Sequence, residues 1–278
     1  MIIDVHAHWG PWFFTMDVAG ATLATMDRYG IDRAIVSSTE AVIYDAPAGN
    51  RALAAALNDQ GNGGVGGRGD GPHARRGAAP DSGRGDSPDG GIEGGRHRLY
   101  GYVTINPRRL QEAVRDLAEY LPTGRFVGVK IHTDYTGSPA TSPQLRDALE
   151  LVASAGCPAL VHTWGPSVLD LAQVCLDTPG LRVIAGHMGA DGFRYAIEAA
   201  SACDRLYLEP CWSHAPAGRI AEVAANVDAR QLLFGTDATL IDPSSAFGSV
   251  AAANLTGETA ERIAWRNAAE LFGLETAL

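Results

Sequence analysis

Near its start the sequence reads Ile2-Ile3-Asp4-Val5-His6-Ala7-His8, a short β-branched run that ends in two histidines. A run of this length and composition predicts a buried strand. Similar runs recur along the chain, and the stretches between them show the apolar spacing of amphipathic helices. The eight predicted strands cover residues 2–6, 34–37, 99–104, 127–132, 159–162, 182–185, 206–209 and 232–235.

The alternation of strands and helices predicts an α/β protein with a parallel sheet. Eight strands is the number that closes a barrel, so we expect residues 1–278 to form one (β/α)8 TIM-type barrel domain. Two predicted helices, 107–121 and 142–155, have clear apolar faces. These faces consist of Leu110, Val114, Leu117 and Leu121 on the first helix and of Leu145, Leu149 and Val152 on the second.

Residues 59–98 interrupt this pattern with 14 glycines, six arginines and almost no large apolar side chain. A stretch of this composition cannot bury a core, so we expect a flexible, low-complexity insertion within the domain. We interpret His73 and His97, which lie in it, as solvated loop histidines.

Composition excludes several classes of protein. The formal net charge of −10 has the wrong sign for a protein that binds nucleic acid or an anionic membrane. The first residues lack the pattern of a signal peptide, and the sequence has no apolar run long enough to span a membrane. The four cysteines are scattered, which favours reduced thiols and a cytoplasmic location. The oligomeric state stays open, with a homodimer as one alternative.

Polar side chains gather at the predicted carboxyl ends of the strands, which is where barrel enzymes build their sites. The residues at these positions are His6, His8, His132, His162, His187 and Asp237. The predicted barrel brings all six to one rim. This rim is therefore the candidate site.

His6 and His8 are two residues apart, so on a strand both imidazoles point to the same side. Two imidazoles and a carboxylate suit zinc or a similar divalent ion. A chance surface pair is the alternative for this motif. Asp4, one step of two earlier, could orient an imidazole by accepting its second N–H. It could equally be an ordinary carboxylate at the start of a strand.

His162 closes an apolar run, which favours a metal ligand over a core histidine. His187 lies between glycines, and we expect it to polarise a substrate carbonyl or to move a proton. Its alternative is a structural histidine at a turn. Asp237 could bind the metal and accept a proton from the metal's water, with a helix N-cap as the alternative.

Further polar and aromatic residues are candidates for lining a substrate pocket. Lys130 and His132 share the inward face of one strand, and an inward lysine is costly unless it is paired. Glu209 follows another strand and is either a substrate contact or an ordinary loop residue. Trp9 and its neighbours Trp12, Phe13 and Phe14 could wall the pocket or pack in the core. Cys211 and Ser213 are likewise either substrate contacts or ordinary loop residues, and His214 is expected in a loop.

Together these residues resemble the amidohydrolase superfamily, specifically the amidohydrolase-related branch that contains aminocarboxymuconate-semialdehyde decarboxylase. The matching motifs are Asp4-x-His6-x-His8, Gly128-Val129-Lys130-Ile131-His132, Val161-His162, Gly186-His187-Met188-Gly189, Gly235-Thr236-Asp237 and Asn267-Ala268-Ala269-Glu270-Leu271-Phe272. They extend over the whole chain in the order that the family has.

The resemblance implies a distorted (β/α)8 barrel with one divalent metal, zinc being the expected ion. Its ligands would be His6, His8, His162 and Asp237, and His187 would be the catalytic imidazole. Lys130 corresponds to a lysine that is carboxylated in binuclear members, and we interpret it as unmodified here because this branch works with one metal. The insertion is the main departure from the family.

The expected reaction is hydrolysis of a C–N or C–O acyl bond of a small molecule by a metal-activated water. A bound metal can lower the pKa of its water to about 7, Asp237 would take the proton, and His187 would stabilise the oxyanion. Non-oxidative decarboxylation of an unsaturated or aromatic acid is the first alternative, with Arg194 as a candidate clamp for the carboxylate. A non-catalytic metal-binding barrel is the second.

Overall fold

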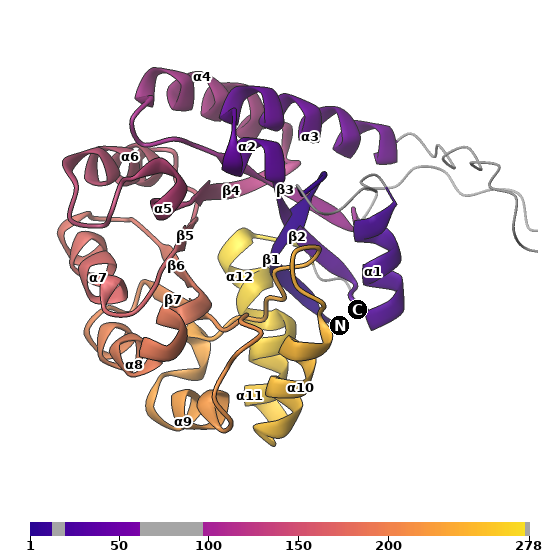
Figure 1. Ribbon diagram of the computed structural model, residues 1–278, viewed down its shortest axis with the longest axis vertical. Helices are drawn as coiled ribbons and strands as arrows, with labels where there is room; N and C mark the ends of the chain where they lie inside the picture. The colour runs from indigo at the N-terminus through magenta and orange to yellow at the C-terminus, as the bar shows by residue number, and fades with distance from the viewer. Residues whose placement is uncertain (13–19, 62–96, 276–278) are drawn as a thin grey trace, which may run out of the picture.

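The computed structural model describes residues 1–12, 20–61 and 97–275, and in these ranges the chain forms one parallel sheet covered by helices (Figure 1). Seven strands pair in the order of the sequence, each with its neighbour along the chain. The strands are β1 (Ile3–Trp9), β2 (Arg33–Ser38), β3 (Leu99–Thr104), β4 (Phe126–Ile131), β5 (Ala159–His162), β6 (Val183–Gly186) and β7 (Leu206–Glu209). The sheet is curled, which confirms the α/β class.

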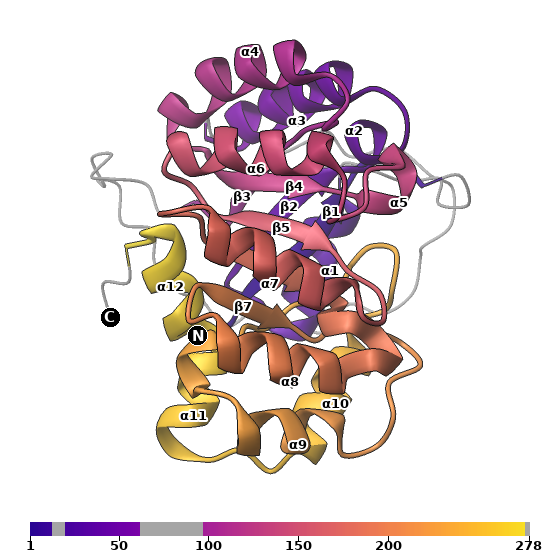
Figure 2. The same ribbon diagram turned by 90° about the vertical axis from the view of Figure 1, so that its left-hand side faces the viewer.

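Helices follow the strands and cover the outer face of the sheet (Figures 1 and 2). Those in the first half are α1 (Ala21–Tyr29), α2 (Thr39–Ile43), α3 (Ala46–Gly61), α4 (Leu110–Tyr120), η1 (Leu121–Thr123), α5 (Thr133–Thr136) and α6 (Pro143–Ser154). Those in the second half are α7 (Ser167–Asp177), η2 (His187–Gly192), α8 (Phe193–Ala202), α9 (Arg219–Asn226), η3 (Ala229–Gln231), α10 (Ser244–Ala252), α11 (Gly257–Glu261), η4 (Arg262–Arg266) and α12 (Asn267–Phe272). None of the helices described here is long and apolar enough to cross a membrane.

The predicted eighth strand, 232–235, is not assigned as a strand. Leu232 forms an isolated parallel bridge with Leu208 of β7, and Ala238, beyond the predicted strand, forms another with Ala7 of β1. The Val5 N–H nevertheless donates to the Phe234 carbonyl at 3.0 Å, so this segment lies against β1. The ladder stays irregular because the amides of two successive residues, 236 and 237, both donate to the carbonyl of His6.

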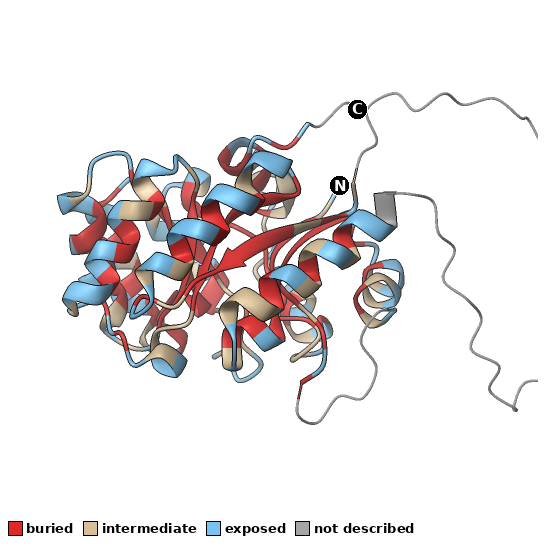
Figure 3. Ribbon diagram, turned by 90° about the horizontal axis from the view of Figure 1, so that it is seen from above, coloured by how far each residue is buried: buried red, intermediate tan, exposed pale blue. Residues whose placement is uncertain are grey.

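Two apolar clusters hold the sheet in place, and strands are buried on both faces (Figure 3). The larger cluster lies between the sheet and the outer helices. The smaller one lies inside the curl, where the Tyr102 ring meets the Phe272 ring of α12 at 5.9 Å. In Figure 1, α12 lies inside the ring that the other helices form. Burial of both faces explains why the strands are continuous apolar runs rather than alternating ones.

Strand β1 does not alternate strictly. Its pairing with β2 shifts register between Asp4 and Ala7. Ile3 and Val5 pack in the inner cluster, whereas Ala7 packs in the outer one. A bulge of this kind changes the face on which the following side chains lie. The prediction that Asp4 and His6 share one face of a regular strand therefore fails.

The helix predictions are confirmed in part. Leu145, Leu149 and Val152 of α6 are fully buried, as expected. On α4, in contrast, Val114 is 50% exposed, because the helix turns Ala113, Asp116, Leu117 and Tyr120 to the core instead.

The predicted insertion begins within α3, which runs to residue 61, and most of it, residues 62–96 with His73, lies outside the described residues. His97 is described, and it is not simply solvated. Its Nδ1 lies 2.7 Å from Nη1 of Arg125. Burial lowers the pKa of His97, and the neighbouring guanidinium lowers it further.

Candidate active site

A cavity of about 510 Å³ opens at the carboxyl ends of the strands. Its size is that of a small-molecule site. Its polar lining consists of His6, His8, Lys130, His132, Asp134, His162, His187, Ser213 and Asp237. The six rim residues that the sequence indicates thus lie around one cavity, although they come from the ends of four strands, β1, β4, β5 and β6, and from the segment after β7.

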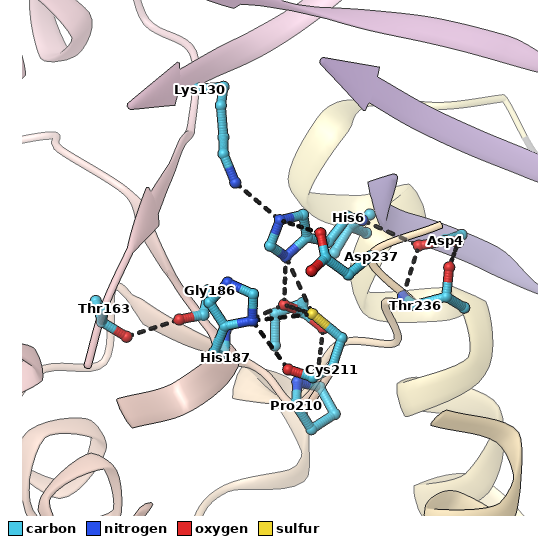
Figure 4. A network of polar contacts seen from close by, with 12 residues as sticks. Asp4, His6, Lys130, Thr163, Gly186, His187, Pro210, Cys211, Thr236 and Asp237 are labelled. Atoms are coloured by element: carbon cyan, nitrogen blue, oxygen red, sulfur yellow. Dashed lines mark hydrogen bonds and ion pairs between the residues drawn. The ribbon is translucent and has the colours of Figure 1, made fainter. Parts of the chain in front are cut away.

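His6 is fixed by a polar partner on each ring nitrogen (Figure 4). Its Nδ1 lies 2.7 Å from Oε2 of Glu209, and its Nε2 lies 2.8 Å from Nζ of Lys130. All three side chains are fully or almost fully buried. Because the Glu209 carboxylate can only accept, Nδ1 carries the proton, and the lone pair of Nε2 accepts from Nζ of Lys130 in the absence of a metal.

His8 is held in the same way by other partners. Its Nδ1 lies 3.0 Å from Oγ of Ser37 on β2, and its Nε2 lies 2.9 Å from Oδ1 of Asp237. Oδ1 of Asp237 is also 3.5 Å from Nε2 of His6. His6, His8 and Asp237 each offer one ligand atom to this place, and the three atoms lie within 4.8 Å of one another.

Asp237 reaches this place through an unusual backbone conformation. Its φ is 59°, in the left-handed region that side chains other than glycine rarely adopt. The Asp237 N–H donates to the His6 carbonyl at 2.7 Å, which ties the aspartate to the strand that carries the two histidines. Strained conformations of this kind cluster at functional sites.

Electrostatics in the cluster favour the protonation states that a metal requires. Burial lowers the pKa of both His6 and His8, so both imidazoles are neutral at neutral pH. Burial alone would raise the pKa of Asp237, but the electrostatic interaction with the adjacent His6 and the hydrogen bond with His8 hold it below its ordinary value. Burial also lowers the pKa of Lys130.

These residues fit a divalent cation. Two neutral imidazoles and an ionised carboxylate point their ligand atoms at one place, which is a donor set that zinc and manganese both accept. His162 lies beside the cluster, with its ring 4.8 Å from that of His187. Its Nδ1 is buried and has no hydrogen-bond partner among the described residues, as expected for a nitrogen that is reserved for a ligand.

Glu209 differs from its predicted role. It is fully buried and does not line the cavity; it lies behind His6. Its Oε2 also accepts the His187 N–H at 3.2 Å, and its Oε1 accepts the Cys211 N–H at 2.6 Å. The Cys211 thiol lies 3.3 Å from Nδ1 of both His6 and His187. Glu209 therefore orients the site and is placed away from any substrate.

The role predicted for Asp4 belongs to Glu209. Asp4 accepts backbone N–H groups from His6 at 3.0 Å and from Thr236 at 3.1 Å, together with the Thr236 hydroxyl at 2.5 Å, and it meets no imidazole nitrogen. It thus joins β1 to the segment that carries Asp237. Burial raises the pKa of Asp4 to about 7, although the hydrogen bonds from Thr236 and His6 oppose this shift.

His187 follows β6 in a strained turn, with a φ of 65°. Its Nδ1 lies 3.0 Å from the carbonyl oxygen of Cys211. Because a carbonyl can only accept, Nδ1 carries the proton and the free nitrogen is Nε2. The ring centroid lies 4.9 Å from that of His6, so this imidazole borders the candidate metal position.

A column of stacked rings forms one wall of the cavity. His132 stacks on Tyr135 at 4.1 Å and on His162 at 4.0 Å, and Trp164 continues the row at 6.0 Å. Burial lowers the pKa of His132 to about 2, and Lys130 lowers it further, so this ring is neutral. The column gives a planar ligand an aromatic surface beside the polar cluster.

The remaining walls of the cavity are also apolar, and only some of the residues that form them were predicted from the sequence. Trp12 lines the cavity as predicted, and its ring lies 4.9 Å from that of His8. Trp9 packs against the core instead, and Phe13 and Phe14 lie outside the described residues. Trp164, Trp212, Tyr135, Leu240 and Ile241 line the cavity without having been predicted. Their position soon after β4, β5, β7 and the segment 232–238 is the signal that could have found them.

Arg194 does not reach the site. Its exposed guanidinium pairs with Glu222 through two contacts of 2.7 and 2.9 Å. Lys130 is thus the one lysine, and no arginine is found, among the described residues that line the cavity.

Residues 92–274 match the family model described as Amidohydrolase, so the chain belongs to the amidohydrolase family. Among solved structures it is similar to 5-carboxyvanillate decarboxylase from Sphingomonas paucimobilis, with a TM-score of 0.68, 12% identity and 99% of both chains covered. The match to decarboxylases agrees with the branch of the family that the sequence motifs indicate.

Two further structures extend the comparison. The chain is similar to a dihydroxybenzoic acid decarboxylase from Polaromonas that holds manganese and the inhibitor 2-nitroresorcinol, with a TM-score of 0.66, 14% identity, and 99% of this chain and 98% of that one covered. It is also similar to a protein from Pseudomonas putida assigned as a 2-pyrone-4,6-dicarboxylic acid hydrolase, with a TM-score of 0.64, 18% identity, and 99% and 98% covered. At these identities the likeness establishes the fold. A search of curated proteins gives no match.

Proposed function

We propose that the protein is a metal-dependent, non-oxidative decarboxylase of a small aromatic acid. The observation that carries this proposal is the cavity itself, in which a wall of stacked rings faces a buried cluster of neutral imidazoles and one carboxylate. An aromatic acid has matching parts, a planar ring and a carboxylate. Its ring would lie against the column of His132, His162 and Trp164.

His6, His8, His162 and Asp237 are the proposed ligands of one divalent ion. When bound, this ion supplies the positive charge that holds the oxygens of the acid and withdraws electrons from the scissile carbon. Zinc is the expected metal from the sequence, and manganese in related structures makes it an equal candidate. The segment 232–238 would complete an eight-stranded TIM-type barrel around the site.

The chain's own residues would carry the remaining chemistry. Decarboxylation breaks the bond between the ring and the carboxyl carbon, leaves the electron pair on the ring, and replaces carbon dioxide by a proton. His187 is the proposed donor of that proton: its Nδ1–H is held by the Cys211 carbonyl, and its Nε2 would take up a proton from solvent and then pass it to the ring carbon. The aromatic walls exclude water, which strengthens the pull of every charge on the acid.

Hydrolysis of an acyl bond is the second candidate, favoured by the likeness to pyrone dicarboxylate hydrolases. In that reaction Asp237 would accept a proton from the attacking water and His187 would stabilise the oxyanion. The lining argues for decarboxylation, because a dicarboxylate calls for several cations and the described walls provide one lysine. A single carboxylate places a smaller demand on the site.

Release of carbon dioxide tests the proposal. The purified protein, stripped with a chelator and reloaded with Zn²⁺ or Mn²⁺, should release carbon dioxide from a panel of hydroxybenzoates only in the loaded form. His187→Asn should lower kcat by about 10²- to 10⁴-fold and leave the bound metal unchanged. Turnover of lactones or amides without carbon dioxide would favour hydrolysis instead. Metal binding without any turnover would favour the non-catalytic barrel.

A further inference from the structure

A second cavity of about 470 Å³ adjoins the catalytic one. The two share His132 and Tyr135, whose stacked rings separate them. The second cavity lies among α2, α3, α4 and α5, which gather at one end of the molecule in both views (Figures 1 and 2). Three arginines line it, Arg51, Arg109 and Arg115, and we refer to it as the arginine cavity.

The arginine cavity carries positive charge that the protein itself does not neutralise. Arg109 pairs with Glu112 at 3.2 Å, whereas Arg51 and Arg115 form no ion pair with any described residue. The second acidic lining residue, Asp45, accepts the Ala48 N–H at 2.8 Å and forms no ion pair with a described residue, so three arginines and two acidic residues leave a formal charge of +1 on the lining. Arg51 and Arg115 are exposed residues, so both guanidinium groups are accessible to a ligand from solvent.

Thr104, at the end of β3, supplies an independent sign of a ligand. This residue lines the arginine cavity and is 3% exposed, and its Oγ1 has no hydrogen-bond partner among the residues of the described ranges. Its backbone is clamped by the amide of Asn50, which accepts the Thr104 N–H at 2.9 Å and donates to the Thr104 carbonyl at 2.8 Å. Asn50 in turn donates to Asp116 at 2.7 Å. The hydroxyl is therefore held in place with an unused donor.

We propose that the arginine cavity binds the oxyanion of a small molecule, a carboxylate or phosphate group. Arg51 and Arg115 bind its charge, and the Thr104 hydroxyl donates a hydrogen bond to one of its oxygens. Guanidinium groups suit this task because their donors match the geometry of both kinds of oxyanion. The occupant is either the far end of a long substrate or a separate ligand. A separate ligand would affect the catalytic cavity through His132 and Tyr135, which line both cavities.

Calorimetric titration of the metal-loaded protein with inorganic phosphate, and separately with succinate, tests the proposal. The double variant Arg51→Gln/Arg115→Gln should bind the preferred anion at least tenfold more weakly. Thr104→Val should also weaken binding and leave Tm unchanged, because the lost hydroxyl has no partner in the free protein. Arg146→Gln, which removes an exposed arginine outside both cavities, is the matched control.

Competition between the anion and the aromatic acid identifies the occupant of the arginine cavity. A phosphate or succinate that competes with the aromatic acid assigns the arginine cavity to the substrate, and simultaneous binding assigns it to a separate ligand. An anion held by the catalytic metal would bind equally to the double variant, so unchanged binding overturns the proposal. The absence of heat from either anion up to about 10 mM overturns it as well. Neither result depends on turnover, so failure of the decarboxylase proposal remains distinguishable.

Discussion

Replacement of Glu209 by glutamine removes a charge from behind the candidate metal centre and leaves the shape of the side chain almost unchanged. Glu209 only accepts in the structure. Its Oε2 faces Nδ1 of His6 at 2.7 Å and the His187 N–H at 3.2 Å, and its Oε1 faces the Cys211 N–H at 2.6 Å. A glutamine has one oxygen and one NH₂ group, so the NH₂ must face at least one of these donors.

Both orientations of the glutamine harm the site. If its oxygen takes the place of Oε2, the NH₂ meets the Cys211 N–H, and a buried donor loses its partner. If its oxygen takes the place of Oε1, the NH₂ faces His6, whose Nδ1 can then accept only by moving its proton to Nε2. That proton would cover the lone pair that points to the metal position.

The size of the effect follows from one lost buried hydrogen bond. Leaving a buried donor unsatisfied costs about 1–3 kcal/mol. Loss of a group that orients a metal-bound histidine lowers metal affinity by about 10- to 100-fold. We therefore expect Glu209→Gln to bind Zn²⁺ or Mn²⁺ at least tenfold more weakly than the unmodified protein.

Competition with a chromophoric chelator measures the affinity directly, and thermal unfolding of the metal-free protein reports on the fold. Glu222→Gln is the matched control, since Glu222 is a partly exposed carboxylate whose one ion pair within the described ranges is with the surface residue Arg194. A Glu209→Gln protein that folds and binds metal as tightly as the control would refute the argument that Glu209 sets the tautomer of His6.

Three further variants test other parts of the structure. Gly235→Ala would place a Cβ 2.6 Å from Cδ of Glu209 and should weaken metal binding and lower the free energy of unfolding by about 1–3 kcal/mol; unchanged values in titration and denaturation would contradict this packing. Trp164→Ala, at a 45% exposed residue, should raise KM for an aromatic acid about tenfold with little change in Tm, and an equal loss in kcat alone would argue against a stacking role. Hydrogen bonds from Ser244 and from Tyr29 lower the pKa of Asp242 to about 2. The stability that Asp242→Asn removes should therefore be present above pH 4 and vanish as the pH falls towards 2, and a Tm difference that grows in acid would contradict this sign.

The order of strands and helices could be predicted because each strand is an apolar run of local sequence. Strands β3, β5 and β7 begin and end at the predicted residues. The eighth strand could not be predicted correctly, since its irregularity arises from two amides that share the carbonyl of His6. No local pattern records a hydrogen bond between the first strand and the last.

The residues at the rim of the site could be predicted because they follow strands that are themselves visible as apolar runs in the sequence. Parallel strands bring their carboxyl ends together, so His6, His162 and Asp237 converge once the strands are located. The residues that hold these side chains from behind could not be predicted in this way. Glu209 pairs with His6 across 203 residues, and the bulge that removes Asp4 from this role depends on how β1 pairs with β2. Both are consequences of packing rather than of composition.

The aromatic wall lies between these two cases. Trp164 follows the predicted ligand His162 by two residues, so its place at the rim could be read from spacing. Its stacking with the histidines depends on the angle at which the chain leaves β5, which spacing does not give. Spacing likewise made Arg194, which follows His187, a candidate clamp for the substrate carboxylate. Helix α8 instead directs its side chain to solvent, where it pairs with Glu222.

The backbone of His6 holds Asp237 in place, and 229 residues separate His8 from the same carboxylate. The chain must therefore be synthesised at least as far as Asp237 before an ion can meet both histidines and the carboxylate together. A fragment that ends before Asp237 would keep the two histidines of β1 without their acidic partner, so a divalent ion should bind such a fragment more weakly than the longer chain.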